Sequence, residues 1–397
     1  MIATPAAKNA AALEPVRSAP PDGRLPIVIG VSGHRHLRAA DLQTLRAQVR
    51  GLFTDLRRRY PATPLRIITA LAEGADRLVA EVALEEGHEL LVPLPLEPAD
   101  YESDFPETVG EFRSILRRVA SEQVFVLPQD DGPDGEQLTP HDRREKRYRA
   151  VGMFVAQQSH VLLALWDGHP TTSGAGTAAA VRMKLEGPSG LPEAGLRPLD
   201  AEDGGPVYHI DAPRTETAPA PKKPKWLLPQ EQDEALFHKL CSRIQRFNSE
   251  RLRRTYLDRL PHAAGALLPN IASCSASEQT LGTAFAAADL YARHYQRLTR
   301  LVLRLTLLFA ALLALIFELY AEVLQVRALP ITYLAAFASL TLILLWQRRR
   351  DVQGRYLDYR ALAEGLRVQF YWRLAGLPDS ASSSYLRKQL DELRWIR

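Results

Sequence analysis

The chain has 397 residues and a formal net charge of +4, with 50 Lys and Arg against 46 Asp and Glu. This length predicts two parts joined by linkers, and the basic surplus lies beside two apolar segments, which favours an anionic lipid leaflet over nucleic acid as partner. Its two cysteines, Cys241 and Cys274, lack the spacing of a disulfide framework or a metal site, which fits a reducing compartment.

Residues 1–24 are rich in Ala and Pro and lack the apolar core of a secretory signal, so we expect a disordered leader.

From 25 to 214, short apolar runs alternate with stretches whose apolar residues recur at spacings of three and four. Strands are expected at 26–31, 65–70, 89–93, 123–127, 161–166 and 207–210. Helices are expected at 39–60, 75–86, 107–120 and 143–158. This alternation predicts an α/β domain whose mostly parallel sheet is covered by helices on both faces.

A turn with the sequence GVSGHR follows the first expected strand. Gly30 and Gly33 permit close approach of the backbone to a ligand, while Ser32, His34 and Arg35 can donate hydrogen bonds to an anion. The turn has neither the Gly-Lys-Ser/Thr ending of a Walker A loop nor the spacing of a dinucleotide fingerprint. Both a phosphate contact and a purely structural tight turn fit this pattern.

A second turn, LAEGAD, follows the strand expected at 65–70. Gly74 stands where a helix begins, and the free N–H groups of a helix N-terminus favour anions. Glu73 is a candidate ligand for a ribose hydroxyl because it precedes the helix. Asp76 lies in the first helical turn, where it could serve the ligand or merely complement the helix dipole.

A third turn follows the strand expected at 161–166 and leads into a glycine-rich loop that opens a helix at 178–184. Its candidate ligand-binding residues are Trp166, Asp167, Gly168, Ser173, Gly174, Gly176 and Thr177. Trp166 could stack on a base or simply close the sheet edge, and the loop amides and hydroxyls could cradle a phosphate. Because the carboxyl ends of parallel strands meet at one edge of a sheet, the three turns together favour nucleotide binding.

No metal site is expected, because the histidines are scattered without thiols or carboxylates at ligand spacing. The run His34-Arg35-His36 fits an anion-facing turn better than a metal site. The charged run at 142–149 predicts a solvated helix face, although Arg143 or Arg147 could reach a ligand phosphate.

The Pro-, Ala- and Lys-rich run TETAPAPKKPK falls in a linker expected at 215–229, so the first domain is placed at 25–214 and a second, all-helical domain at 230–397. Helices are expected at 230–259, at 277–300 without a break into the first apolar segment, and at 384–397. An apolar stripe should pack on the helix that enters the membrane. Its members are Tyr356, Tyr359, Leu362, Leu366 and Phe370.

Two apolar segments, 301–320 and 328–347, are separated by a short connection and predict a helical hairpin across a bilayer. The second approaches the roughly 20 apolar residues that a spanning helix needs, while the uncharged centre of the first is flanked by Arg304 and Glu318. Arginines precede the first segment and follow the second, which predicts that both chain ends are cytoplasmic. The alternative is a hairpin buried inside a soluble domain.

Five motifs together resemble the SLOG superfamily, Rossmann-like domains related to cytokinin-activating phosphoribohydrolases and to nucleotide-sensing modules of some cation channels. They are GVSGHR at 30–35, LAEGAD at 71–76, LWDG at 165–168, GAGT at 174–177 and VYHIDAPR at 207–214. The two apolar segments and the run YRALAEGLRVQFYWRLAG at 359–376 resemble the SLATT domain, a two-helix membrane effector that occurs with SLOG modules. The two resemblances cover most of the chain.

These resemblances imply a bacterial conflict or antiphage-defence protein in the inner (cytoplasmic) membrane. The SLOG part would sense a nucleotide-derived messenger, made by an upstream nucleotidyltransferase or TIR-type enzyme. The SLATT part would form a homo-oligomer that permeabilises the lipid bilayer. No cofactor and no direct contact with nucleic acid is implied.

The related hydrolases carry the motif PGGxGTxxE with a catalytic glutamate, and Ala180 stands in its place here. Cleavage of a glycosidic bond needs a carboxyl group, so we expect ligand binding without catalytic residues. A membrane-anchored nucleotide hydrolase, such as an N-glycosidase or phosphohydrolase, is the alternative. A scaffold that binds only a partner protein is a third possibility.

Overall fold

The computed structural model describes residues 23–128, 139–169, 176–187, 204–214, 219–229, 234–251, 267, 274–324 and 326–377. Most of the expected leader, the site candidates Ser173 and Gly174, and the expected helix at 384–397 lie outside these residues. The chain forms two compact units, one comprising Leu25–Asn248 and the other Ser249–Arg397. Each is described by itself below.

The first unit contains a mostly parallel sheet, with the described strands in the order β4-β3-β2-β1-β5-β6-β7. Neighbours from β4 to β6 run parallel, and β7 joins β6 antiparallel. The strands are β1 (Ile27–Gly33), β2 (Leu65–Ile68), β3 (Glu89–Leu94), β4 (Val124–Val126), β5 (Val161–Trp166), β6 (Val207–Asp211) and β7 (Lys225–Leu227). The prediction of a Rossmann-like parallel sheet is therefore confirmed.

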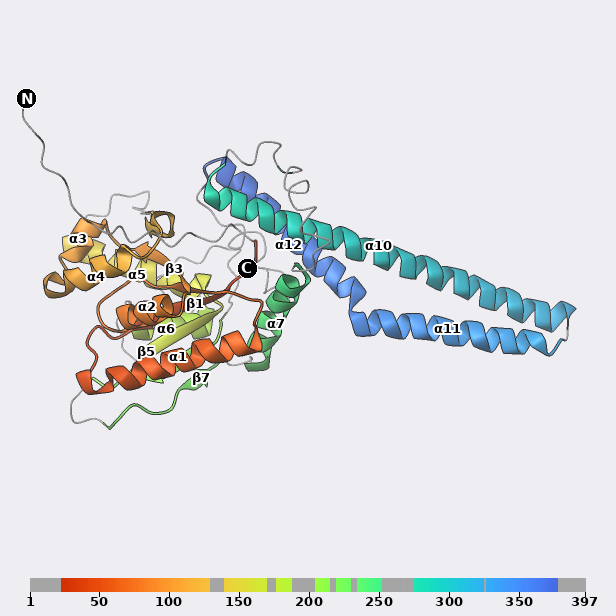
Figure 1. The fold of residues 1–397 in the computed structure, drawn as a ribbon, viewed down its shortest axis with the longest axis horizontal. Helices are drawn as coiled ribbons and strands as arrows, with labels where there is room; N and C mark the ends of the chain where they lie inside the picture. Colours follow the sequence, from red (N-terminus) through yellow and green to blue (C-terminus); the bar gives the residue numbers. More distant parts are fainter. Residues whose placement is uncertain are drawn as a thin grey trace, which may run out of the picture. The chain divides into compact units, whose positions relative to one another are not determined.

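The chain changes direction across the sheet between β4 and β5. From β1 it moves outward through β2, β3 and β4, and then returns to place β5 on the other side of β1 (Figure 1). Ile29 lies beside Val161 and Gly33 beside Leu165 in the β1–β5 pair. In sheets of this kind, ligands bind at the carboxyl ends of the two strands that flank this switch point. Here those strands are β1 and β5.

Amphipathic helices cover the sheet. They are α1 (Leu42–Arg59), α2 (Ala75–Glu85), α3 (Pro98–Glu102), α4 (Val109–Leu116), α5 (Pro140–Gln158) and α6 (Thr177–Glu186). α1 packs on α2, and α5 packs on α6. Right-handed crossovers place α1 and α2 on one face, and α5 and α6, reached after the change of direction, on the other. The alternation of strands and helices expected from the sequence is thus found in the structure.

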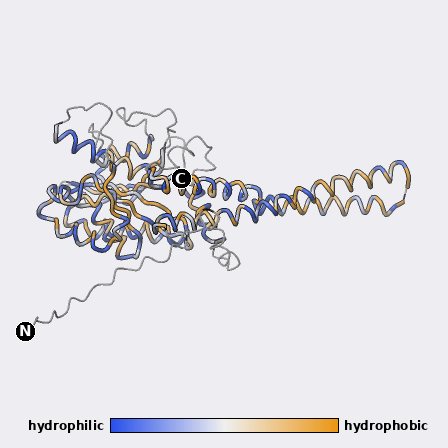
Figure 2. Tube along the Cα trace, turned by 90° about the horizontal axis from the view of Figure 1, so that it is seen from above, coloured by the Kyte–Doolittle hydropathy of each residue, from blue (hydrophilic) through white to orange (hydrophobic). Residues whose placement is uncertain are grey.

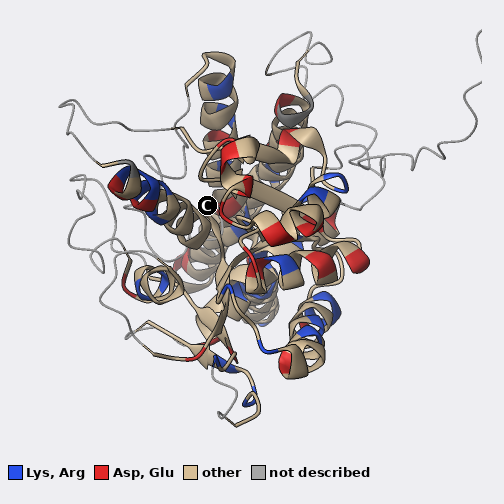
Figure 3. Cartoon of the chain, turned by 90° about the vertical axis from the view of Figure 1, so that its left-hand side faces the viewer, with Lys and Arg blue, Asp and Glu red and all other residues tan. Residues whose placement is uncertain are grey.

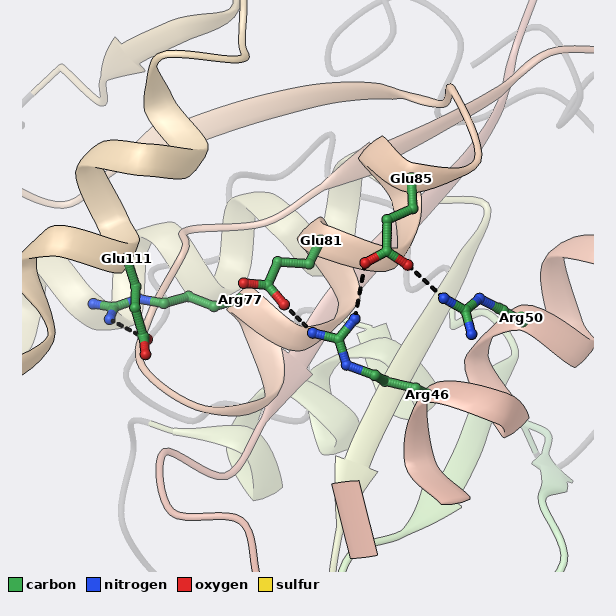
Figure 4. Close-up of polar contacts among 6 residues, drawn as sticks. All are labelled: Arg46, Arg50, Arg77, Glu81, Glu85 and Glu111. Atoms are coloured by element: carbon green, nitrogen blue, oxygen red, sulfur yellow. Dashed lines mark hydrogen bonds and ion pairs between the residues drawn. The ribbon is translucent and has the colours of Figure 1, made fainter. Parts of the chain in front are cut away.

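Ion pairs join α1 to α2 on the solvent side of their contact. Arg46 pairs with Glu81 and Glu85, and Arg50 pairs with Glu85 (Figure 4). These side chains are about a third to a half exposed, and such pairs each contribute roughly 0–1 kcal/mol. Both signs of charge are interspersed on the helices around the sheet, so these arginines are surface structure and not a ligand site (Figure 3).

The expected domain boundary differs from the observed one. Residues Lys225–Leu227, placed in the linker by the sequence, form edge strand β7. Helix α7 (Glu234–Arg251), assigned to the second domain, packs into the first unit as far as Asn248. Its buried face consists of Phe237, Cys241, Ile244 and Phe247. The physical reason is this apolar face, together with a fully buried Asn248 side chain that bonds both backbone groups of Leu25.

The second unit is helical. α10 (Ala276–Glu318) begins at a capping box formed by Ser275 and Glu278, and continues through a π-helical turn at Leu319–Val323. α11 (Ala328–Arg350) returns alongside it, and α12 (Val352–Leu374) follows after a left-handed residue, Asp351 (Figure 1). The expected unbroken helix into the first apolar segment, and the helical hairpin, are confirmed.

The predicted apolar stripe of α12 packs on α10. The Tyr359 ring contacts the rings of Tyr291 and Tyr295, with centroids 5.7 Å apart in both pairs. Leu362 and Phe370 are also buried. α12 ends at Leu374, just before Gly376, whose φ of +72° suits a helix C-terminus.

Apolar residues predominate along much of α10 and α11 (Figure 2), and in this chain their side chains are almost fully exposed. Only 11% and 6% of their most apolar stretches are buried, and Leu307 and Ile331 are 62% and 69% exposed. The core helices of a soluble protein would be mostly buried, so the alternative of a buried hairpin does not describe this unit. Both helices are long and apolar enough to cross a membrane.

Candidate functional site

The candidate site lies at the carboxyl ends of β1 and β5, and begins with His34. Its backbone N–H donates to the carbonyl of Leu165 at 3.0 Å, and its own carbonyl accepts from the N–H of Ala75 at 3.0 Å. These two bonds fix the turn after β1 between β5 and the start of α2. The His34 side chain is 5% exposed.

Three polar side chains converge at this point. His34 Nε2 lies 3.3 Å from Asp167 Oδ1 and accepts from the backbone N–H of Asp167 at 3.1 Å. Arg214, three residues after β6, places Nε 3.2 Å from Asp167 Oδ2 and 3.1 Å from His34 Nε2. The cluster therefore joins the ends of β1, β5 and β6, and below it is called the switch-point cluster.

Electrostatics in the switch-point cluster keep His34 neutral and Asp167 charged. Burial, and then the Arg214 guanidinium, lower the pKa of His34 despite the opposing charge of Asp167. Burial would raise the pKa of Asp167, but the His169 N–H, the His34 ring and the Arg214 guanidinium outweigh it and lower that pKa. Arg214 is 57% exposed and so presents a solvated guanidinium at the strand edge.

The glycines of the first two turns serve the packing of the protein on itself. A Cβ on Gly74, whose φ is +80°, would lie 2.0 Å from the carbonyl oxygen of Arg35, and a Cβ on Gly33 would lie 2.4 Å from Ala75 Cβ. The first turn therefore crosses directly over the start of α2. Since His34 already accepts from the Ala75 N–H, that N–H is not free for an anion, contrary to the expectation.

The second turn is locked by internal contacts. Glu73 Oε1 accepts from Thr108 Oγ1 at 2.8 Å, so its expected role with a ribose hydroxyl would compete with this bond. Arg77 is 3% exposed and donates to the carbonyl of Leu71, a buried residue held at a φ of +55°. Figure 4 shows Arg77 also reaching Glu111, 3.5 Å away. Strained backbone of this kind persists only when its surroundings hold it.

Asp76 is buried beneath this turn, where its Oδ2 accepts from Thr69 Oγ1 at 3.0 Å. Burial raises its pKa to about 7, against the lowering effect of hydrogen bonds from Thr69 and the Ala72 and Ala70 backbone and of the Arg35 charge. These internal contacts favour a structural role over the expected contact with a ligand.

The raised pKa of Asp76 predicts a pH-dependent stability. Between pH 4 and 7 the native carboxyl keeps its proton while the unfolded one has lost it, so stability falls as pH rises through this window. From pH 5 to 8 the free energy of unfolding of the wild type should fall by about 2–3 kcal/mol relative to Asp76→Asn. Denaturant unfolding in detergent, followed by tryptophan fluorescence at several pH values, measures this difference. Parallel pH profiles for the two proteins would contradict the prediction.

The third turn is only partly described. Trp166 is 8% exposed and belongs to the core with Ala178 and Val181, so it closes the sheet edge and is not placed to stack on a base. Gly168 and Gly176 are exposed, each with a positive φ, and Thr177 is the first residue of α6. Ala180, which the sequence resemblance aligns with the catalytic glutamate of the hydrolases, is buried in the same core.

Of the predicted site residues, the structure brings His34 and Asp167 together. Arg35 is exposed, with its guanidinium carbon 5.6 Å from the centroid of the Tyr148 ring. Trp166 is buried away from solvent. Gly30 is packed against Ser159, and Ser32 is half-buried within β1. Arg214 was missed as a candidate. Its signal was its position directly after a strand end, within the motif VYHIDAPR. Among the described residues, no group of three or more His, Cys, Asp or Glu could hold a metal.

Comparison with known proteins adds little on function. Residues 283–373, most of the helical unit from α10 to α12, match a family model described as a protein of unknown function, DUF4231. No curated protein matches the chain. The solved structure of DNA processing protein A (DprA) from Streptococcus pneumoniae is similar at 17% identity, over 39% of this chain and 45% of that protein, with a TM-score of 0.25. The chain spans less than half of that protein, and a likeness this weak carries no argument about activity.

Proposed function

We propose that this chain is a nucleotide-gated membrane effector of a bacterial conflict or antiphage-defence system. Its first unit, of SLOG type, binds an anionic nucleotide-derived messenger at the switch-point cluster. Its second unit, of SLATT type, inserts the α10–α11 hairpin into the inner membrane with both chain ends cytoplasmic. Binding then favours an assembly of hairpins that permeabilises the bilayer.

The proposal that the first unit binds a messenger rests on the switch-point cluster. Arg214 and Arg35 offer exposed guanidinium groups at the edge where parallel sheets bind ligands, and Arg214 is oriented by Asp167 and His34. A planar guanidinium with fixed direction suits the paired oxygens of a phosphate. The neutral imidazole of His34 leaves the charge of the site to the arginines.

The proposal that the second unit inserts into a membrane rests on the exposed apolar surface of the α10–α11 hairpin. Exposed apolar surface of this extent marks a membrane or protein interface. Two helices cannot enclose a pore, so the effector must act as an oligomer. Driving a population from nearly all closed to nearly all open requires about 5.5 kcal/mol of preference for the open state. Several bound messengers per oligomer can supply that total together.

Vesicle leakage tests this proposal. Purified full-length protein is reconstituted into vesicles of anionic lipid that contain a self-quenching dye, and linear nucleotides, cyclic oligonucleotides and ADP-ribose derivatives are added one at a time. We expect one class to release the dye at concentrations that also raise the melting temperature of the protein. No leak with any of them, from protein shown to be inserted, would remove the proposal.

A membrane-anchored nucleotide hydrolase is the second candidate, and the pKa of about 7 at Asp76 favours it, since a general acid works best near the ambient pH. Asp76 is, however, almost fully buried and already hydrogen-bonded. Release of free base or phosphate from nucleotides by the wild type, stopped in Asp76→Asn, would place the hydrolase first.

A further inference from the structure

Glu318 is an isolated charge in the hairpin. It is the last residue of α10, and between Leu305 and Ala321 it is the only charged residue, while α11 has none from Ala328 to Gln347. Its side chain is exposed, and within the described residues it makes no hydrogen bond or ion pair. The serine and threonine hydroxyls of the hairpin differ, because they donate to backbone carbonyls four residues back. These are Thr306, Thr332, Ser339 and Thr341, at 2.8–2.9 Å.

The hairpin geometry gives the depth of Glu318 in a membrane. Because the turn between Val323 and Ala328 is short, residues equally far from it lie at similar heights, which places Arg304 level with Gln347 and Arg348. These basic residues mark the cytoplasmic boundary. Glu318 is fourteen residues further along α10 (304 to 318), or about 21 Å at 1.5 Å per residue. The hydrocarbon core is about 30 Å thick, so the carboxylate lies about 9 Å inside its outer edge.

The carboxylate also points away from α11. Ile316 on α10 and Ala336 on α11 are buried, and the two helices pack on each other, so we infer that Ile316 faces α11. Glu318 is two residues later and therefore about 200° around the helix, on the opposite side. The π-helical turn begins at the next residue, where the Leu324 N–H donates to the Leu319 carbonyl, five residues back, at 2.8 Å. Such turns occur often at functional sites.

We propose that Glu318 lines the lumen of the assembled hairpins, with one carboxylate from each copy forming a ring that binds and passes monovalent cations. This inference rests on the proposed membrane function. An ionised carboxylate is unfavourable against lipid tails, and intramembrane charges almost always face a bundle interior or a water-filled cavity. Cyclic symmetry brings identical carboxylates around one axis, where they repel unless water and cations separate them.

The other charges near the lumen favour the same site. Glu322 lies one turn further out, at the outer edge, and adds to the negative potential, while Arg327 is in the connection. Arg304 and Arg348–Arg350 surround the cytoplasmic end, about 20 Å or more along the helices from Glu318, so they do not pair with its carboxylate. Rings of acidic side chains select cations in known channels.

Ion selectivity of the full-length protein in planar bilayers tests the inference. Reversal potentials are measured in a KCl gradient for the wild type, Glu318→Gln and the matched control Glu322→Gln, with insertion of each checked by vesicle flotation. We expect the wild type to prefer K⁺ over Cl⁻ by about tenfold or more, Glu318→Gln to lose most of this preference, and Glu322→Gln to keep most of it.

The outcomes separate this inference from the proposed function. Inserted wild-type protein that conducts no ions under any nucleotide tested would overturn both. Conductance without preference for K⁺, or an unchanged preference in Glu318→Gln, would overturn the cation ring alone and leave the membrane effector standing. A preference that reverses toward Cl⁻ in Glu318→Lys would support the ring independently.

Discussion

Replacing Arg214 with methionine should weaken binding of the nucleotide messenger by about 10- to 100-fold, because a hydrogen bond to a charged group contributes roughly 1.5–3 kcal/mol. Methionine keeps much of the length of the side chain and removes the guanidinium that Asp167 and His34 orient. Arg214→Lys should also bind weakly, since a point charge does not reproduce the planar donor pair. Calorimetric titration with the nucleotide that triggers leakage measures the change.

The matched control is Arg58→Met, in which an arginine 74% exposed on α1 is lost without touching the switch-point cluster. A second readout reports the site directly. Because the Arg214 charge lowers the pKa of His34, Arg214→Met should raise that pKa, which NMR of the imidazole can follow in the free protein. Equal affinities in Arg214→Met and Arg58→Met would place the messenger elsewhere.

Replacing Arg355 with methionine should destabilise the helical unit by about 3–5 kcal/mol, the usual cost of leaving one partner of a buried pair uncompensated. Arg355, early in α12, pairs with Glu250, whose carboxylate also accepts from the hydroxyls of Tyr295 at 2.9 Å and Tyr359 at 2.8 Å. The side chains of Arg355 and Glu250 are only 21% and 9% exposed. Thermal unfolding in detergent, followed by circular dichroism, measures the loss.

Two companion variants make this result specific. The double variant Glu250→Gln, Arg355→Met removes both charges and should recover much of the lost stability. Arg367→Met breaks a pair with Glu364 that is half exposed on the arginine side, and should cost less than about 1 kcal/mol. A double variant no more stable than Arg355→Met would show that the pair is not what holds these helices.

The parts of the fold that the sequence predicted well are those set by local periodicity. The strand at Val161–Trp166 is a continuous apolar run, and it is buried at every residue. The unbroken helical pattern from 277 into the first apolar segment predicted α10, although the capping box at its start was not foreseen. Such features depend on neighbours within a few residues, so the chain alone reveals them.

The predicted domain boundary was wrong because an apolar sequence pattern shows that a helix face is buried but does not show which part of the chain covers it. The apolar face of α7 was recognisable, yet nothing local shows that Asn248 bonds to Leu25 across the first unit. β7 has three residues after a proline-rich run and forms only because β6 offers an open edge.

The candidate site followed the same division. The turns at the strand ends were found because glycines and polar residues follow apolar runs. Arg214 was missed because its contact with His34 depends on the pairing of β6 with β5, which no local pattern contains. For the same reason, the bonds that occupy Glu73 and Asp76, from Thr108 and Thr69, could not be foreseen.

In the proposed function, occupancy of the switch-point cluster controls the membrane hairpin, and this control can be measured. It is tested most directly by dye release from vesicles that carry equal amounts of inserted wild type or Arg214→Met, measured across a range of messenger concentrations. We expect the half-maximal concentration to rise in Arg214→Met by the same factor as its dissociation constant, with similar maximal leakage. Dye release that does not depend on messenger concentration would contradict control of the hairpin by the cluster. So would identical dose-response curves for the two proteins although Arg214→Met binds the messenger more weakly.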